Sequence, residues 1–154
     1  MKFSTREEID APVQDVWKAV TDTATFEERA RGKGVQVTAG QEADALKPGD
    51  SWSAEFDFHG MSRKMEVNVT NLKAPVAYDI ASRVSGVNSL LSVQLEALPK
   101  DRTRMALALD LTPASVPGRV LIQTLKLAKA TLDKRFRRAI RRFAKDLGRK
   151  DHAG

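Results

Sequence analysis

Large apolar residues alternate with polar ones along most of the first two thirds of the chain, and this period of two is typical of β-strands with one covered face. The alternation is cleanest between Trp52 and His59. Further stretches of this kind span 2–10, 35–39, 61–72, 76–81, 91–95 and 105–111, separated by Gly and Pro residues. Because short turns join most of these stretches, we expect seven strands in one antiparallel sheet with a single apolar face.

Two short helices are predicted between the first strand and the second. Pro12 suits the first turn of a helix, and Val13, Val16, Trp17 and Val20 then repeat at helical spacing. A second helix is expected over 22–30, and the Gly32-Lys33-Gly34 turn follows it. We expect the second helix and the Gly32–Gly34 turn to gate access to the space under the sheet, with the strand pair joined near Gly86 as a further candidate.

The last third of the chain has the period of a single long α-helix, from Val116 to Leu147. The apolar stripe consists of Leu121, Leu125, Ala128, Leu132, Phe136, Ile140, Phe143 and Leu147. At about 1.5 Å per residue this helix would be on the order of 45 Å long, enough to cross a small domain. Ser115 and Gly148 are its expected caps. We expect one domain over 1–150 and a disordered tail over 151–154.

This order of elements resembles the START-like helix-grip superfamily, which includes the Bet v 1-like, SRPBCC, polyketide cyclase and lipid-transport proteins. The resemblance rests on Ile9-Asp10-Ala11-Pro12-Val13-Gln14-Asp15-Val16-Trp17 and on the turn Lys47-Pro48-Gly49-Asp50-Ser51-Trp52. It implies an α+β fold with a curved seven-stranded antiparallel sheet around a long C-terminal helix. It also implies a largely apolar cavity between sheet and helix, because members of the superfamily bind lipids, sterols, polyketides, hormones or aromatic intermediates.

Candidate cavity residues fall on the apolar phase of the strands and on the stripe of the C-terminal helix. They are Trp52, Phe56, Phe58, Met65, Tyr78, Ile80, Leu107, Leu125, Leu132 and Phe136. For any one of them an ordinary core position is the favoured interpretation, whereas contact of the set with a cavity is what the resemblance to the helix-grip fold implies. The Tyr78 hydroxyl would either donate to a ligand or find a partner within the core, and the second interpretation is favoured.

The sequence favours binding over catalysis. The expected inner face offers few polar residues, namely Tyr78, Ser82 and Thr103, with Arg63 near the rim, and no acid–base or nucleophile–base pair appears among them. The superfamily has no shared catalytic motif to transfer. We therefore expect a protein that binds, transports or sequesters a small hydrophobic ligand. The alternative is a cyclase or dehydratase acting on an aromatic or polyketide substrate.

Positive charge is concentrated in the C-terminal helix. Residues 1–117 hold 14 Lys and Arg against 17 Asp and Glu, whereas residues 118–150 hold 12 Lys and Arg against two Asp, a balance of +10. The core of this basic surface is Lys134, Arg137, Arg138, Arg141 and Arg142. A solvated helix face is the favoured interpretation, and docking on an anionic membrane or an acidic partner is the alternative. Nucleic acid is disfavoured because no recognition motif accompanies the charge.

Composition excludes several kinds of functional site. The chain has 154 residues, is 42% hydrophobic and contains no cysteine, which excludes disulfides, thiolate metal sites and thiol catalysis. Its two histidines, His59 and His152, lack the spacing of a metal site, so we expect neither metal nor cofactor. The N-terminus is charged and no run approaches the roughly 20 apolar residues of a membrane span. A cytoplasmic location is therefore expected.

Overall fold

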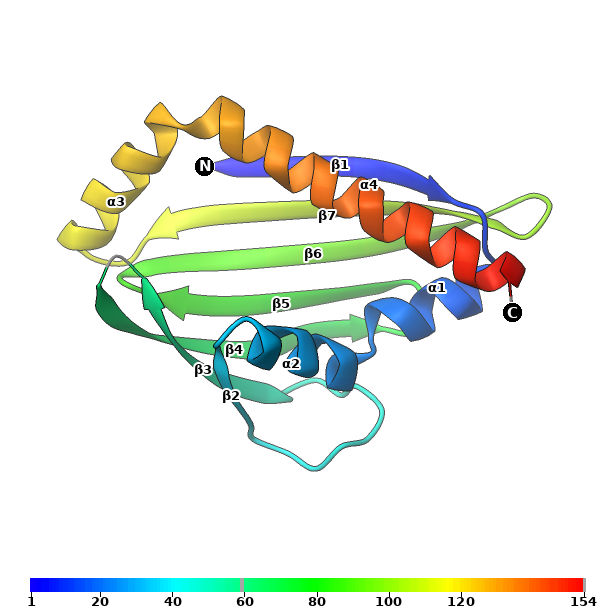
Figure 1. The fold of residues 1–154 in the computed structure, drawn as a ribbon, viewed down its shortest axis with the longest axis horizontal. Helices are drawn as coiled ribbons and strands as arrows, with labels where there is room; N and C mark the ends of the chain where they lie inside the picture. The colour runs from blue at the N-terminus through cyan, green and yellow to red at the C-terminus, as the bar shows by residue number, and fades with distance from the viewer. Residues whose placement is uncertain (59, 154) are drawn as a thin grey trace.

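The computed structural model describes residues 1–58 and 60–153 and confirms the α+β helix-grip fold (Figure 1). Its strands are β1 (Lys2–Ile9), β2 (Gln36–Ala39), β3 (Ser51–Phe58), β4 (Met61–Lys73), β5 (Ala77–Val84), β6 (Val87–Leu98) and β7 (Arg102–Pro113). Its helices are α1 (Val13–Val20), α2 (Thr23–Gly32), α3 (Val116–Leu127) and α4 (Lys129–Ala153). His59, for which the sequence indicates no metal site, lies outside the described residues.

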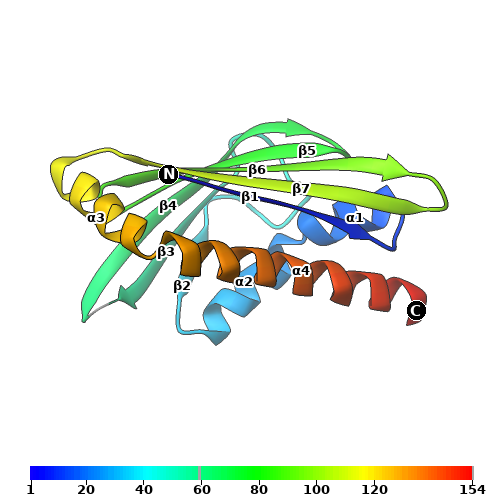
Figure 2. The same cartoon turned by 90° about the horizontal axis from the view of Figure 1, so that it is seen from above.

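All seven strands form one antiparallel sheet in the order β1-β7-β6-β5-β4-β3-β2, so the first strand pairs with the last. The β4–β5 register shifts between Val69 and Asn71, and a bulge of this kind bends a strand and increases its twist. Figure 2 shows the sheet curved, with α1, α2 and α4 on its concave side. We call the sheet face toward these helices the inner face.

The densest packing lies at the end of the sheet that α1 covers. Val16 and Val20 of α1 are buried against Tyr78, Val93 and Met105 of the inner face. The apolar spacing in 13–20 explains this, because it puts valine on the side of the helix that meets the strands. The other end of the sheet has no comparable cluster among the buried residues.

The prediction of one unbroken C-terminal helix was wrong. The helix stops at Leu127 and restarts at Lys129, and the backbone of Ala128 lies outside the α-helical region, with φ −104° and ψ 13°. Figure 1 shows α3 turned sharply away from α4 at this point. Ser115 caps α3 as predicted, since its hydroxyl accepts a hydrogen bond from the Gly118 amide. Gly148 does not end α4, which continues to Ala153 through most of the tail expected to be disordered.

Helix α4 makes its main strand contact with the edge strand β1 and runs from there toward α1, where Ala144 joins the buried core (Figure 1). The Phe136 ring lies 6.1 Å from the Phe3 ring, and Arg141 pairs with Glu7 at 3.4 Å. Near the helix end, Gly148 is buried close to Asp10. Because α4 contacts mainly the edge strand, much of the inner face toward α3 is left without a covering helix.

Candidate functional site

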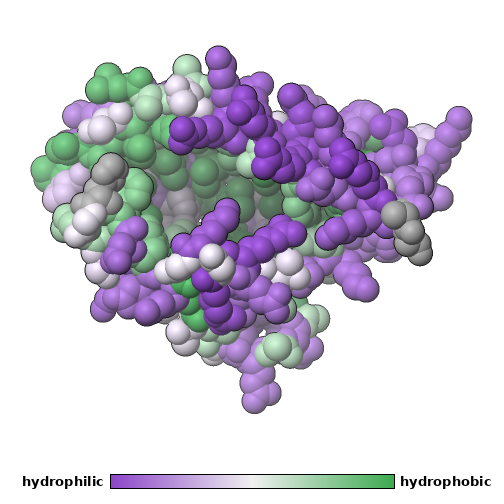
Figure 3. Space-filling model, in the orientation of Figure 1, coloured by the Kyte–Doolittle hydropathy of each residue, from purple (hydrophilic) through white to green (hydrophobic). Residues whose placement is uncertain are grey.

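The inner face is hollowed between α2 and α4, as the space-filling view shows (Figure 3). Hydrophobic residues form the floor of the hollow, and hydrophilic residues form its rim. Strand register places Trp52, Val67, Ser82, Ser89 and Leu111 in one row across this face. All five are half-buried, so the folded chain fills the space above them incompletely. We call this hollow the trough.

Most residues that the sequence predicted for a cavity are neither fully buried nor fully exposed. Trp52, Phe56, Met65, Ile80, Leu107, Leu125, Leu132 and Phe136 are half-buried. Of these, Ile80 and Leu107 also pack against the α1 core. Phe58 lies at the tip of the β3–β4 hairpin and is 53% exposed, so it belongs to the rim and not to the floor. Ligand contact by this set remains a prediction.

Tyr78 sits in the core and already has a hydrogen-bond partner. Its hydroxyl donates to the carbonyl oxygen of Val20 at 2.7 Å, and its ring lies edge-on to Trp17 with centroids 5.8 Å apart. Burial raises the pKa of Tyr78 to about 12, because the phenolate would lose its hydration. The geometry matches the favoured interpretation of a core tyrosine and leaves the hydroxyl engaged with backbone.

Two polar features interrupt the inner face. The hydroxyls of Ser82 and Ser89 hydrogen-bond across β5 and β6 in the middle of the row. Arg63 lies on β4 opposite Phe56, donates to the Ser85 hydroxyl at 2.9 Å, and has a buried Nε without a partner in the described part of the chain. The serine hydroxyls and the half-buried guanidinium of Arg63 are the polar groups of an otherwise apolar site, although the Nε itself is closed to solvent.

Ser89 was missed in the sequence, although the signal was present. Ser85 and Gly86 both have positive φ, 51° and 75°, which is the geometry of a two-residue hairpin turn. Pairing the strands about that turn sets Ser89 opposite Ser82. Thr103, by contrast, is fully buried and donates to the Ala11 carbonyl at 2.8 Å, so its hydroxyl serves the core.

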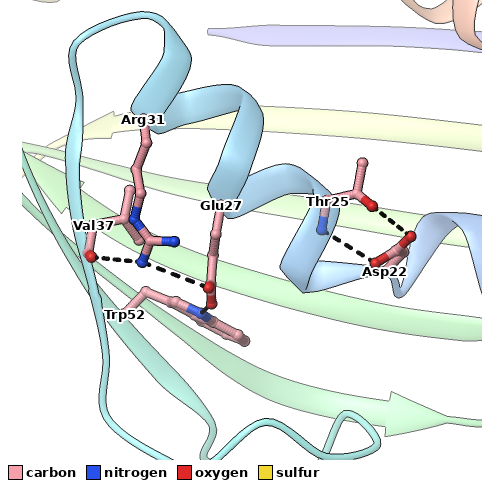
Figure 4. A network of polar contacts seen from close by, with 6 residues as sticks. All are labelled: Asp22, Thr25, Glu27, Arg31, Val37 and Trp52. Atoms are coloured by element: carbon pink, nitrogen blue, oxygen red, sulfur yellow. Dashed lines mark hydrogen bonds and ion pairs between the residues drawn. The ribbon is translucent and has the colours of Figure 1, made fainter.

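Helix α2 is held at the rim of the trough by polar contacts (Figure 4). The Trp52 indole Nε1 donates to Glu27 at 2.6 Å, and Arg31 donates to the Val37 carbonyl at 3.0 Å. Arg31 also lies 3.7 Å from Glu27. No residue of α2 is buried, and the Phe26 ring lies 6.5 Å from the Phe143 ring of α4. This helix therefore rests on the sheet through a few side chains and not through a packed core.

The predicted basic residues are all exposed, but they differ in their partners. Arg137 pairs with Asp133 at 3.2 Å and Arg141 with Glu7, whereas Lys134, Arg138 and Arg142 form no ion pair with a described residue. Arg142 also lines a groove of about 830 Å³ that separates α1 and α2 from α4. That groove also contains the acidic residues Asp15, Asp22, Asp146 and Asp151, so its lining carries both signs of charge.

The described residues include neither a metal-binding cluster nor a carboxylate on the inner face of β3 to β6. None of them forms a group of three or more His, Cys, Asp and Glu side chains that could hold a metal ion. No described helix is both long enough and apolar enough to cross a bilayer.

The polyketide cyclase/dehydrase and lipid transport family model matches residues 1–148. The chain belongs to this family. No protein with a curated description matches it in sequence. Membership agrees with the helix-grip fold and with the strand-Ala-Pro-helix pattern around Pro12, and it explains a curved sheet that leaves space beneath its helices.

Several solved structures resemble this family member in fold. A protein from Arthrobacter aurescens is 20% identical over 96% of this chain and 86% of its own, with a TM-score of 0.64. The Zhui aromatase/cyclase from Streptomyces sp. R1128 is 13% identical over 75% of this chain and 70% of its own, with a TM-score of 0.58. Ara h 8.0201 is 14% identical over 87% of this chain and 93% of its own, with a TM-score of 0.56. At these identities the likeness concerns the fold.

Proposed function

We propose that this protein binds a small hydrophobic or amphipathic molecule in the trough. The observation that carries the proposal is the half-buried apolar floor, which a folded chain would ordinarily cover with its own side chains. A ligand that covered this floor would gain about 25 cal/mol for each Å² of apolar surface removed from water. Membership in a lipid-transport and cyclase family agrees with such a ligand.

The polar features of the inner face would set the orientation of the ligand. Ser82 and Ser89 lie in the middle of the floor, where either hydroxyl can donate to a carbonyl or ether oxygen. Arg63 lies toward the β5–β6 turn, and its half-buried guanidinium suits a more polar end of the same molecule. An elongated amphipathic molecule satisfies both features better than a compact apolar one.

Binding is favoured over a cyclase or dehydratase reaction. Either reaction needs a proton donor or acceptor beside the substrate. The described inner face of β3 to β6 has no carboxylate, and the Tyr78 hydroxyl is engaged by the Val20 carbonyl. Turnover that survived in Ser82→Ala, Ser89→Ala and Arg63→Gln variants would argue for catalytic groups elsewhere on the rim.

The first test is native mass spectrometry of the purified full chain, followed by denaturing extraction and identification of released small molecules. We expect a bound hydrophobic molecule near one per chain, and its structure would give the ligand class. A chain that is folded and empty, and that no hydrophobic compound in a panel stabilises against heat, would contradict the proposal.

A variant that fills the trough makes this test specific. Val67→Trp adds volume in the middle of the floor, and we expect it to lower ligand occupancy strongly while the protein stays folded. Leu90→Trp is the matched control, because Leu90 lies on the outer face and is 42% exposed. Equal occupancy in both variants would place the ligand outside the trough.

A further inference from the structure

Helix α3 is apolar on two opposite faces. Its inward face contains Gly118 and Ile122, which are buried, and Leu121 and Leu125, which are half-buried. This face packs on β6 and β7. A helix at the surface of a soluble protein usually has a polar outward face, so apolar residues there call for an explanation.

The outward face of α3 presents three aliphatic side chains to solvent. Val116 is 72% exposed, Val120 58% and Leu127 91%. At about 100° per residue these three positions fall within an arc of roughly 40° on the helix surface. We call these three side chains the aliphatic strip, which the exposed polar residues Gln123 and Thr124 flank between Val120 and Leu127.

A second exposed apolar pair lies at the same end of the molecule. Phe58 and Met61 face each other at the tip of the β3–β4 hairpin and are 53% and 58% exposed. Figures 1 and 2 both place this tip and α3 at one end of the sheet, and Figure 3 shows hydrophobic surface there. We call the surface made by Val116, Val120, Leu127, Phe58 and Met61 the apolar end.

Positive charge borders the apolar end. Residues 111–132 contain three cations, Arg119, Lys126 and Lys129, and no acidic residue. At about 100° per residue, Arg119 and Lys126 lie beside the aliphatic strip on one side of α3. The rest of α4 continues the same charge, with nine Lys and Arg against three Asp over 130–153.

We propose that the apolar end docks on the surface of an anionic lipid bilayer. The aliphatic strip would enter the boundary between headgroups and acyl chains, while Arg119, Lys126 and Lys129 meet lipid phosphates. A second copy of the chain is a poorer occupant, because a two-fold contact brings identical surfaces together and would oppose these cations to each other. This docking is independent of the ligand proposed for the trough and would hold if the trough were empty.

Vesicle flotation of the full chain tests the docking. We expect binding to vesicles of phosphatidylcholine mixed with phosphatidylglycerol, weaker binding to phosphatidylcholine alone, and a decrease when salt is added. The double substitution Val120→Gln and Leu127→Gln should lower partition about tenfold or more, since each buried aliphatic side chain contributes on that order. Leu90→Gln, an exposed leucine on the outer sheet face, should bind like the unmodified chain.

The absence of cysteine allows a direct measure of insertion. A Leu127→Cys chain and a Leu90→Cys chain each accept one environment-sensitive fluorophore. On anionic vesicles the label at position 127 should shift to the blue, and the label at position 90 should not. Equal shifts at both positions, or binding that Val120→Gln with Leu127→Gln leaves intact, would overturn the proposal.

Sedimentation in the absence of lipid tests whether a second copy of the chain covers the apolar end. The docking model expects a monomer whose sedimentation is the same in the unmodified chain and in the Val120→Gln, Leu127→Gln double variant. A dimer that this variant dissociates would show that a second copy covers the apolar end, and the proposal would then be wrong.

Discussion

The hydrogen bond of the Tyr78 hydroxyl to the Val20 carbonyl indicates that this side chain stabilises the fold and does not bind the ligand. The Tyr78→Phe substitution keeps the ring against Trp17 but removes the donor to the Val20 carbonyl. We expect a loss of about 1–2 kcal/mol in the free energy of unfolding, because a buried acceptor loses its partner. Urea denaturation measures this loss. Ligand affinity should not change, and a variant with normal stability but lost affinity would instead make the hydroxyl a ligand donor.

His152 gives the end of α4 a dependence on pH. Its Nε2 lies 2.8 Å from Asp10, and that hydrogen bond and charge raise the pKa of His152 above its ordinary value. A raised pKa in the folded state means that the contact contributes fully below the unfolded pKa and is lost as pH rises through the folded one. Asp151 acts in the same direction, because its hydrogen bond to Asp15 and the repulsion between the two carboxylates raise the pKa of Asp151.

We therefore expect the last turn of α4 to be held more firmly at mildly acidic pH than above neutrality. A proton NMR titration of His152 should give a lower pKa in an Asp10→Asn chain than in the unmodified one. Amide exchange near residue 150 should accelerate as pH rises, after correction for the intrinsic rate. An unchanged His152 pKa in Asp10→Asn would remove this explanation.

Individual residues could be predicted only as far as local pattern determines them. Ser115 as a helix cap and Val16 in the core follow from spacing and residue type. The outward aliphatics of α3 were missed because the prediction followed one stripe through Leu121 and Leu125, and the residues on the opposite side were not counted. Gly148 was predicted as a helix cap but instead lies inside α4, buried close to Asp10. That contact joins distant parts of the chain, so local pattern could not predict it.

Among the elements, α3 is positioned by a close contact between two glycines. A Cβ at Gly118 would overlap the carbonyl group of Gly86 in the β5–β6 turn. The Gly118→Ala substitution should therefore push α3 off the sheet and cost about 1–3 kcal/mol of stability. Gly32→Ala is the matched control, because a Cβ there meets nothing within 4 Å and alanine favours a helix. Equal denaturation midpoints for the two variants would contradict this account.

The break between α3 and α4 was not predictable from local pattern. Leu125, Ala128 and Leu132 continue the helical period, and no Gly or Pro interrupts them. The two segments have different partners, since α3 packs on β6 and β7 while α4 packs on β1. The turn at Ala128 follows from these two docking sites, which lie far away in the sequence.

For the whole molecule, the antiparallel meander from β2 to β7 could be predicted from local pattern, whereas the pairing of β1 with β7 and the shape of the space under the sheet could not. Short turns and alternating patterns imply an antiparallel meander, which the sheet confirms. The volume under the sheet depends on where α4 lies, and that depends on contacts such as Phe3 with Phe136 and Glu7 with Arg141. A helix on the edge strand leaves the trough open, whereas a helix across the middle would fill it.

The molecule is packed unevenly from end to end, and this predicts which segments exchange their amide protons slowly and which ones a ligand protects. The α1 end holds the buried core around Ile9, Val16 and Met105, whereas α2 has no buried residue and the floor near Trp52 is half-buried. Without ligand, amide exchange should be slowest in the strands beneath α1 and faster in α2 and the β3–β4 hairpin, because regions with few buried apolar contacts open more easily.

A hydrophobic ligand that occupies the trough should raise protection most in α2 and in the trough-lining part of β3 to β5. Binding to the folded state stabilises the whole chain by mass action. The largest rise in amide protection is nevertheless expected in the segments that form new apolar contacts with the ligand. Exchange measured by mass spectrometry with and without the extracted ligand checks this, and the Val67→Trp chain is the control that should show no gain. Protection that rose equally everywhere would mean that the ligand stabilises the fold without contacting the trough. Protection confined to the α1 end would place its site in the packed core.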